Sequence, residues 1–444
     1  MMRRTLLSAV VFTGVAAALG LACDKAEKRP ALRVAHIYEP LAGPTQEACH
    51  QWLEDVAVQF KDSHTTLDVQ LEQVQWNKID AKSMSDYRAH IPHDVVMSSP
   101  QLMPQHFDVG DLLDLGPFLA AWPPEQVEDF AWTPSWKKCR RGEVQLGIPT
   151  GVHARVVIYR KDYFRDAGLD PDNPPADLDS LIAAAKRLTR DTNNDTRTDV
   201  WGLGLYLGPT RATIELYFAP LLWHFGGDLY DPQSRRAIFA SEAGAKAARW
   251  LRDCIMTHRI TSPAALGEKY DDVIFEEFMR GRLAMAWGWG SYWNWVLEEK
   301  GFTEGLLPPT PEGKSDKVGI FVTPTREGAQ FANSWTVSIH SLSERPGAAF
   351  EFIETMLTPA NLEKYADGLP ARMSMWERPE YSTPWYQTWR RAVAAGRSMS
   401  DTPDYNDLAD KVSTALQEII LKNSDPLETL RRHQDEFNAR YAEP

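Results

Sequence analysis

The chain has few cysteines and no excess of basic charge. Its 444 residues carry 48 Lys and Arg against 61 Asp and Glu, a net charge of −13, which argues against nucleic acid as a partner. Four cysteines without a C-x-x-C spacing argue against structural zinc. The motifs G-x-S-x-G, H-E-x-x-H and the P-loop are also missing. These absences exclude the most clearly marked classes of hydrolase and nucleotide-binding protein.

The amino-terminal segment is typical of an export signal. Two arginines precede a small, apolar stretch, residues 5–21, which is too short for a membrane span. Cys23 follows a small residue, as in bacterial lipoproteins, although Gly20 stands where the usual pattern has Leu. We expect residues 1–22 to be a signal peptide and residues 23–30 a lipid-anchored tether at the periplasmic face of the cell membrane. The alternative is an ordinary signal peptide cut at the same place.

Three cysteines remain if Cys23 carries a lipid. An odd number cannot all pair, and none of the three is spaced as in a redox motif. We expect buried thiols, with at most one disulfide among Cys49, Cys139 and Cys254.

The body of the chain alternates between strand-like and helix-like patterns. Short apolar or alternating runs indicate strands, and apolar residues at helical spacing indicate helices. This alternation predicts an α/β fold with sheets covered on both faces, and ligands bound outside the carboxyl ends of the strands. The predicted strands are 32–38, 67–71, 94–97, 144–148 and 155–159, and the predicted helices include 47–60 and 178–189.

The segment from Gly281 to Trp295 has an unusual density of aromatic residues. A short buried strand is predicted at 283–286, and beyond it glycines alternate with tryptophans. Glycines end regular structure, so we expect a loop that exposes flat rings. Such rings suit the apolar face of a sugar. The alternative interpretation is that these tryptophans pack in the core.

Six segments along the mature chain match motifs of one family in the family's order. They are similar to the motifs of extracellular solute-binding proteins of ABC importers, in the sugar-binding branch that includes maltose-binding protein. Arg160 replaces the Asn that is usual in one of them. The segments are 147–149, 157–169, 225–229, 278–285, 348–353 and 368–372.

The resemblance implies a two-lobed periplasmic-binding-protein fold of type II, whose lobes close on ligand about hinge crossings. The crossings are expected near residues 148–154, 333–338 and 368–371. The amino-terminal lobe would comprise residues 31–150 and 336–368, and the carboxyl-terminal lobe residues 151–335 and 369–444.

A sugar site needs aromatic faces together with polar groups for hydroxyls. By the family's pattern, Tyr292 takes the place of the stacking aromatic residue. A structural role is the alternative for each polar candidate. The aromatic candidates are Trp223, Trp287, Trp289, Tyr292, Trp293 and Trp335. The candidates at strand ends and crossings are Tyr38, Glu39, Ser98, Ser99, His153 and Arg372.

Residues 191–199 resemble part of a calcium-binding loop. Oxygen-bearing side chains stand at positions 1, 3, 5 and 9 of an EF-hand-like spacing, and a backbone carbonyl would serve at position 7. Thr196 replaces the glycine of position 6, and no Glu stands at position 12. We expect structural calcium and no other cofactor; the alternative is a plain polar loop. The predicted ligands are Asp191, Asn193, Asp195, Arg197 and Asp199.

The sequence therefore predicts a monomeric, non-catalytic lipoprotein that binds a saccharide between its lobes and delivers it to the membrane subunits of an ABC importer. One alternative is an exported carbohydrate-active enzyme, which would need two carboxylates across the sugar. Another is a binding protein for a glycerol phosphodiester or a polyol, in which Arg155, Arg211 and Arg372 are the arginines available for phosphate.

Overall fold

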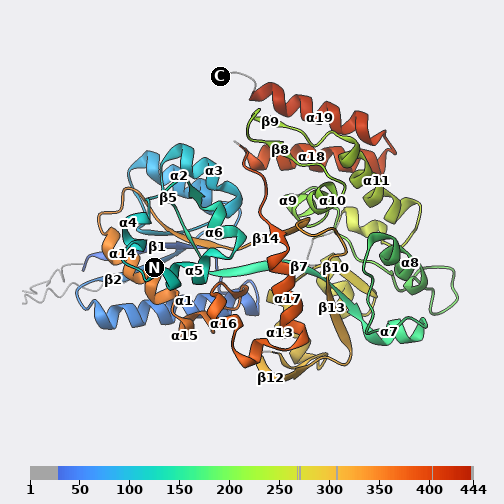
Figure 1. Cartoon of the computed structure of the whole chain (residues 1–444), viewed down its shortest axis with the longest axis horizontal. Coiled ribbons are helices and arrows are strands. Elements are labelled where there is room, and N and C mark those ends of the chain that lie inside the picture. The colour runs from blue at the N-terminus through green and yellow to red at the C-terminus, as the bar shows by residue number, and fades with distance from the viewer. Residues whose placement is uncertain (1–28, 268, 270–271, 307–308, 403, 442–444) are drawn as a thin grey trace, which may run out of the picture.

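The computed structural model describes the chain except for residues 1–28, 268, 270–271, 307–308, 403 and 442–444. The described part forms two lobes side by side (Figure 1). The predicted signal peptide and Cys23 lie outside the described residues. Within the described part, no helix is long and apolar enough to cross a membrane. Cys49, Cys139 and Cys254 are free and buried, so the prediction of buried thiols is confirmed.

The amino-terminal lobe is built on a five-stranded sheet in the order β2-β1-β3-β15-β6. The first three strands are parallel, and β15 is antiparallel to both of its neighbours. This late strand returns to the lobe after residues 151–333, which form most of the sheet of the other lobe. The bounds are β1 Ala31–His36, β2 Asp68–Gln73, β3 Val95–Ser98, β6 Ile148–Pro149 and β15 Thr336–Ile339.

Helix α1 (Pro44–Ser63) covers this sheet because its apolar residues recur at helical spacing. Trp52, Val56 and Phe60 are fully buried, and the ring of Phe60 meets that of Phe352 at 5.5 Å. The other helices of the lobe are α2 Ile79–Ala89, α3 Met103–Val109, α4 Gly116–Leu119, α5 Pro124–Ala131, α6 Pro134–Lys138, α14 Pro346–Met356 and α15 Pro359–Leu362.

The carboxyl-terminal lobe is organised around one long strand, β7 (Gly151–Arg160). β7 pairs antiparallel with β10, β13, β14 and β16 along its length. All but two of its residues are buried, as expected of a central strand. The partners are β10 Met285–Gly290, β13 Val318–Val322, β14 Gln330–Asn333 and β16 Leu369–Pro370, with β17 Gly396–Arg397 on β14.

Helices surround this second sheet (Figure 1). The long ones are amphipathic, and several begin at a side-chain cap, such as Asp177 before α8 and Ser241 before α11. The principal helices are α7 Lys161–Asp166, α8 Leu178–Leu188, α10 Ala219–His224, α11 Glu242–Met256, α13 Asn294–Glu299, α17 Pro384–Ala394, α18 Tyr405–Leu421 and α19 Pro426–Arg440.

Three segments pass between the lobes. β6 belongs to the first sheet and β7, one residue later, to the second; β14 and β15 are divided in the same way. The third segment leaves β16, and Ala371 and Met375 then pack in the core of the amino-terminal lobe. Ala371, Arg372, Ser374 and Met375, expected in the carboxyl-terminal lobe, therefore pack on the amino-terminal one, where Arg372 pairs with Asp129 at 2.6 Å, while Met373 packs against the carboxyl-terminal core.

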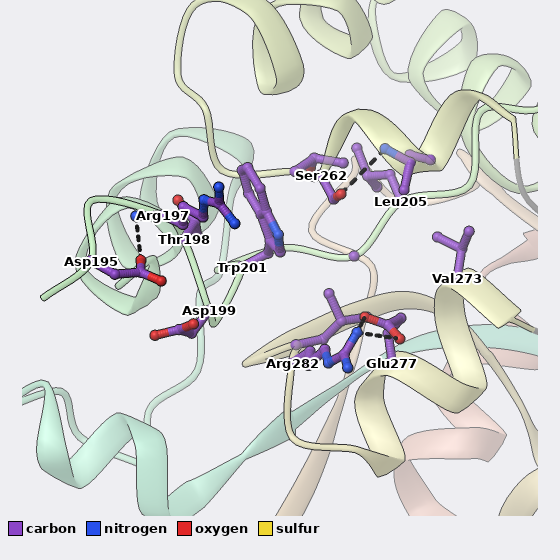
Figure 2. Close-up of a pocket in the computed structure, with 15 residues that line it drawn as sticks. Asp195, Arg197, Thr198, Asp199, Trp201, Leu205, Ser262, Val273, Glu277 and Arg282 are labelled. Carbon is purple, nitrogen blue, oxygen red and sulfur yellow. Dashed lines mark hydrogen bonds and ion pairs between the residues drawn. The ribbon is translucent and has the colours of Figure 1, made fainter. Parts of the chain in front are cut away.

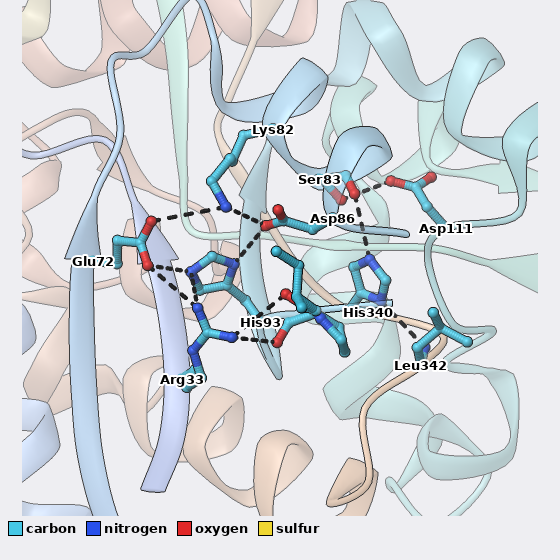
Figure 3. Close-up of polar contacts among 11 residues, drawn as sticks. Arg33, Glu72, Lys82, Ser83, Asp86, His93, Asp111, His340 and Leu342 are labelled. Carbon is cyan, nitrogen blue, oxygen red and sulfur yellow. Dashed lines mark hydrogen bonds and ion pairs between the residues drawn. The ribbon is translucent and has the colours of Figure 1, made fainter. Parts of the chain in front are cut away.

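A polar network of the amino-terminal lobe lies along one side of α2. Figure 3 shows His93 between two carboxylates: its Nδ1 lies 3.0 Å from Asp86 and its Nε2 2.8 Å from Glu72. Lys82 pairs with Asp86 on the same helix. The hydrogen bond from His93 is the main cause that lowers the pKa of Glu72. Buried charges on α2 are thus paired rather than isolated, as burial requires.

His106 holds the second part of this network. Its ring is fully buried, with Nε2 3.0 Å from Asp80 and Nδ1 2.9 Å from Asp111. Burial alone would lower the pKa of His106, but the hydrogen bonds with Asp111 and Asp80 raise it to about 9. Asp80 also accepts a hydrogen bond from the backbone N–H of Ser99, at the end of β3. The imidazolium therefore supports the loop that follows this strand.

The raised pKa of His106 makes stability depend on pH. Because the folded pKa of about 9 exceeds the unfolded value near 6.5, the contribution is full below pH 6.5 and is lost as the pH rises through 9. We expect the difference in unfolding free energy between wild type and His106→Gln, up to about 3 kcal/mol at neutral pH, to shrink by pH 10. Urea unfolding from pH 6 to 10 measures this, with His258→Gln as control. A difference that stays constant with pH would contradict the assignment.

Candidate functional site

The carboxyl ends of β1, β2 and β3 all face the carboxyl-terminal lobe, and the segment after each strand contacts it. Thr45, after β1, donates from Oγ1 to the carbonyl of Tyr292 at 2.9 Å. Trp76, after β2, lies under the guanidinium of Arg211 at 4.5 Å. Open parallel sheets place ligands at this edge. We call the following set the interlobe junction: Thr45, Trp76, Gln101, Arg155, Arg211, Glu215 and Tyr292.

Glu215 is the buried carboxylate of the junction. It lies in η2 (Ile214–Phe218) and is 8% exposed. Tyr405 donates to its Oε1 at 3.1 Å, Gln101 reaches the same oxygen from the other lobe at 3.5 Å, and Arg211 lies 3.8 Å away. Burial raises the pKa of Glu215, and the charge of Arg211 partly offsets this. A carboxylate so placed gains from any further donor brought by a ligand.

Arg155 is a cation that follows the first crossing in the sequence. It lies on β7 with its guanidinium 5.2 Å from the ring of Tyr292. Asp367, just before β16, is almost fully buried, and burial raises its pKa to about 7 while the charge of Arg155 acts in the opposite direction. Arg155 also lowers the pKa of Glu215. The charge of this one guanidinium therefore favours the ionised form of two buried acids from different parts of the chain.

The aromatic segment 285–295 is more deeply buried than the loop expected from its glycines. The strand β10 continues to Gly290, with an irregularity at Gly288 (φ +112°) that lets successive tryptophans pack against different elements. Trp287 packs on Trp250 of α11, and Trp289 packs on Phe278.

Trp287, Trp289 and Trp293 therefore lie in the core, where the alternative interpretation placed them. Tyr292 alone of the four predicted rings is partly exposed, and it lies at the interlobe junction. The expected wall of several rings is corrected to one ring from this segment.

The predicted site residues of the amino-terminal lobe are mostly structural. Tyr38 is fully buried and donates from its hydroxyl to that of Tyr365 at 2.9 Å. Ser98 bonds within the sheet, to Thr336. Ser99 donates to the side chain of Gln101 at 2.9 Å and so orients a junction residue, while Glu39 is exposed.

The remaining predicted residues lie around the hinge and in the carboxyl-terminal lobe. Arg372 donates to Asp129 of the amino-terminal lobe, so its guanidinium is held by this ion pair. Trp223 is fully buried, with Nε1 donating to Asp228 at 3.0 Å. His153 is buried at the first crossing, where burial lowers its pKa to about 3. Trp335 is half-buried between β14 and β15 and packs against the core of the amino-terminal lobe.

Sequence reasoning missed four residues of the interlobe junction, Thr45, Trp76, Gln101 and Glu215, and also Tyr405, which donates to Glu215. Trp76 could have been found, because it follows a predicted strand in the way that Tyr38 and Ser98 do, and half of its surface is exposed. Glu215 and Tyr405 lie far apart in the sequence and have no motif around them. Their helices must pack before the two side chains meet.

The predicted calcium loop forms a tight turn. Thr196 has a φ of +72°, the left-handed conformation that glycine supplies at position 6 of an EF-hand. The carboxylate of Asp191 accepts from the backbone N–H groups of Asn194 and Thr196, and that of Asp199 accepts from Thr192. Among the described residues, no group of three or more His, Cys, Asp or Glu side chains could hold a metal ion. The turn at Thr196 therefore has the backbone conformation that an EF-hand-like loop needs.

Calcium at residues 191–199 remains a prediction from the spacing. Calcium at about 100 times its dissociation constant would add about 2.7 kcal/mol to the free energy of unfolding. Melting curves in calcium and in chelator measure the gain, and Asp191→Asn should abolish it. Identical melting curves in both conditions would show that calcium does not stabilise the loop, which is then held by the hydrogen bonds from its backbone N–H groups.

These features define a two-lobed, hinged α/β binding protein with its candidate site between the lobes. The sequence model for bacterial extracellular solute-binding proteins matches residues 43–363, and the chain belongs to this family. The two-lobed fold predicted from the resemblance is confirmed. The family is one of exported binding proteins rather than enzymes.

Solved structures of similar fold cover nearly the whole chain. A solute-binding protein of an ABC transporter from Thermotoga lettingae TMO, bound with α-D-tagatose, is 20% identical with a TM-score of 0.74, covering 92% of this chain and 99% of that one. The sugar-binding protein MalE from Xanthomonas citri is 15% identical with a TM-score of 0.74, covering 93% and 98%.

Curated relatives match over shorter stretches. A protein of Sinorhizobium fredii (strain NBRC 101917 / NGR234), named as a probable amino-acid ABC transporter periplasmic-binding protein, is 23% identical over 240 residues. The match covers 53% of this chain and 49% of that relative, so the chain spans about half of its length. A binding protein of Brucella abortus (strain 2308) is 24% identical over 289 residues, 63% of this chain and 64% of its own length.

Proposed function

We propose that the protein captures a saccharide at the interlobe junction and delivers it to the membrane subunits of an ABC importer, without catalysis. The observation that carries this proposal is the pair of aromatic rings presented by opposite lobes. Trp76 comes from the amino-terminal lobe and is half exposed; Tyr292 comes from the carboxyl-terminal lobe and is partly exposed. Two such rings can hold the apolar faces of a sugar as the lobes close.

The polar groups of the junction suit hydroxyl groups. Glu215 offers carboxylate oxygens, Gln101 an amide with both donors and acceptor, and Arg155 a forked set of donors. Saccharides are named in the descriptions of several structural neighbours, including tagatose, maltose and cycloalternan. Those neighbours share the fold with this chain, which makes a saccharide the first class of ligand to test.

A second candidate ligand is an anionic polyol such as a glycerol phosphodiester. Of the three arginines that could serve a phosphate, Arg155 and Arg211 both reach the junction, and both act on Glu215. Arg372 is held by Asp129 instead. A thermal-shift panel of neutral sugars, polyols and phosphodiesters separates the two candidates. A saturating shift without product formation also separates binding from an enzyme.

Ligand affinity should depend on the two opposed rings. We expect Trp76→Ala and Tyr292→Ala each to weaken binding of the best panel ligand by at least about tenfold, or 1.4 kcal/mol, with little change in melting temperature. Trp289→Ala is the matched control: its ring is in the core, so stability should fall by about 3–5 kcal/mol while binding per folded molecule persists. Calorimetry beside melting curves measures both. Wild-type affinity in both junction variants would place the ligand elsewhere.

We also propose that the mature protein is anchored at the periplasmic face of the membrane by a lipid on Cys23, and acts there as a monomer. The basis is the apolar segment that ends in a small residue before this cysteine. Cys23→Ser should appear in the soluble fraction, or keep its signal peptide, when cells are fractionated. A variant that fractionates and migrates as wild type would exclude lipidation.

A further inference from the structure

The carboxyl-terminal lobe contains a cavity of about 500 Å³ that shares no residue with the interlobe junction. Figure 2 shows its wall, in which the side chain of Trp201 stands between Thr198 on one side and Ser262 on the other. Arg282 and Glu277 lie across the cavity from Ser262 and point toward each other. The volume lies within the range of sites that bind small molecules. None of the lining residues comes from the amino-terminal lobe.

The backbone around the cavity is fixed by sheet pairing. Residues 200–205 run beside β10 as a parallel neighbour, through the bridges Trp201↔Leu283 and Gly204↔Ala286. The N–H of Trp201 donates to the carbonyl of Arg282 at 2.9 Å, and the carbonyl of Trp201 accepts from Ala284 at 2.9 Å. Trp201 and Arg282 are therefore held side by side by the main chain.

The opposite rim is fixed in the same way. The N–H of Leu207 donates to the carbonyl of Ala265 in η3 (Pro263–Leu266) at 2.8 Å, and Thr261 donates from Oγ1 to the carbonyl of Leu203 at 2.8 Å. Ser262 stands before η3 and accepts from Ala264, and a serine hydroxyl that accepts one hydrogen bond can also donate one. The cavity is a built feature of the lobe rather than a gap between mobile side chains.

The wall combines one aromatic ring with paired donors and acceptors. Trp201 is partly exposed. Nη1 of Arg282 lies 3.4 Å from Glu277 Oε2, with the two side chains 60% and 24% exposed. A guanidinium beside a carboxylate presents donors and acceptors at adjacent points, as a vicinal pair of hydroxyls requires. Asp195, Arg197 and Asp199 of the lining belong to the predicted calcium loop, and the other two charged residues, Glu277 and Arg282, form a neutral pair, which suits an uncharged ligand.

We propose that this cavity is a second saccharide site, which takes a neutral sugar ring against Trp201 with its hydroxyls on Arg282, Glu277 and Ser262. The cavity is a separate site from the interlobe junction proposed for transport, and binding in the cavity does not depend on the junction. Because a single lobe supplies every lining residue, binding here requires no closure of the lobes. Since one ring and one ion pair provide fewer contacts than a closed interlobe site, its affinity is in the millimolar range.

The test uses the full mature chain with Trp76→Ala and Tyr292→Ala combined, which removes both rings of the junction. Maltose, D-tagatose and ribitol are the probes, and saturation-transfer NMR and calorimetry are the measurements. At least one probe should still bind at millimolar concentration. Arg282→Ala, or Ala264→Trp at the exposed rim, should then weaken that binding at least tenfold. Arg280→Ala is the matched control, because Arg280 also pairs with Glu277 but does not line the cavity.

The outcomes separate the two sites. Loss of all probe binding in the double junction variant, with melting temperature retained, overturns the second site and leaves the proposed function in place. Residual binding that is unchanged by both Arg282→Ala and Ala264→Trp also overturns it. If the junction variants leave binding unchanged and Arg282→Ala removes it, the cavity is the sugar site and the proposed function fails. Ala121→Trp, at an exposed alanine of the other lobe, controls for the added indole.

Discussion

The pairing of β7 is the constraint on which the rest of the structure depends. The strand starts one residue after β6, an edge strand of the first sheet, and pairs with four antiparallel partners. Its register fixes the site directly: Arg155 pairs with Gly290, just before the turn that carries Tyr292, while His153 pairs with Asn333 and Val152 with Leu369. The three connections between the lobes, together with Arg155 and the turn that carries Tyr292, are thus positioned by one strand. A slip of one residue would turn every side chain to the other face.

The junction concentrates buried charge where the lobes meet. Burial alone raises the pKa of Glu215 and of Asp367, and the nearby arginines oppose this rise. Each of these carboxylates is stabilised by partners from distant parts of the chain. The cost of removing the carboxylates from water is therefore offset only when the whole carboxyl-terminal lobe is assembled. The same groups are the natural partners of a polar solute, whose hydroxyls can supply hydrogen bonds that water would otherwise make. The polar side chains that stabilise the lobe are therefore also the ones available to bind the solute.

The amino-terminal lobe also contains buried charged groups, which lie along α2. Asp80 and Asp86 of α2 are buried carboxylates, matched by the imidazoles of His106 and His93. Asp80 also accepts a hydrogen bond from the backbone N–H of Ser99, and the hydroxyl of Ser99 donates to the side chain of Gln101 at the junction. The loop that meets the other lobe is consequently held by a chain of charged and polar contacts. Such contacts define one geometry more narrowly than apolar packing does.

The sequence by itself determined the class of fold, the order of its elements and the family, because hydrophobic periodicity and short motifs are local properties. It also predicted Tyr292 as a ligand-facing ring, and the structure places this ring, partly exposed, at the interlobe junction. It could not separate Tyr292 from Trp287 and Trp289, since the irregularity at Gly288 and the helices that cover the two tryptophans are set by packing between distant segments. Nor could it bring Trp76 and Glu215 to one junction, or Tyr405 against Glu215. Burial and the meeting of charges depend on which surfaces face each other, and only the tertiary structure decided that.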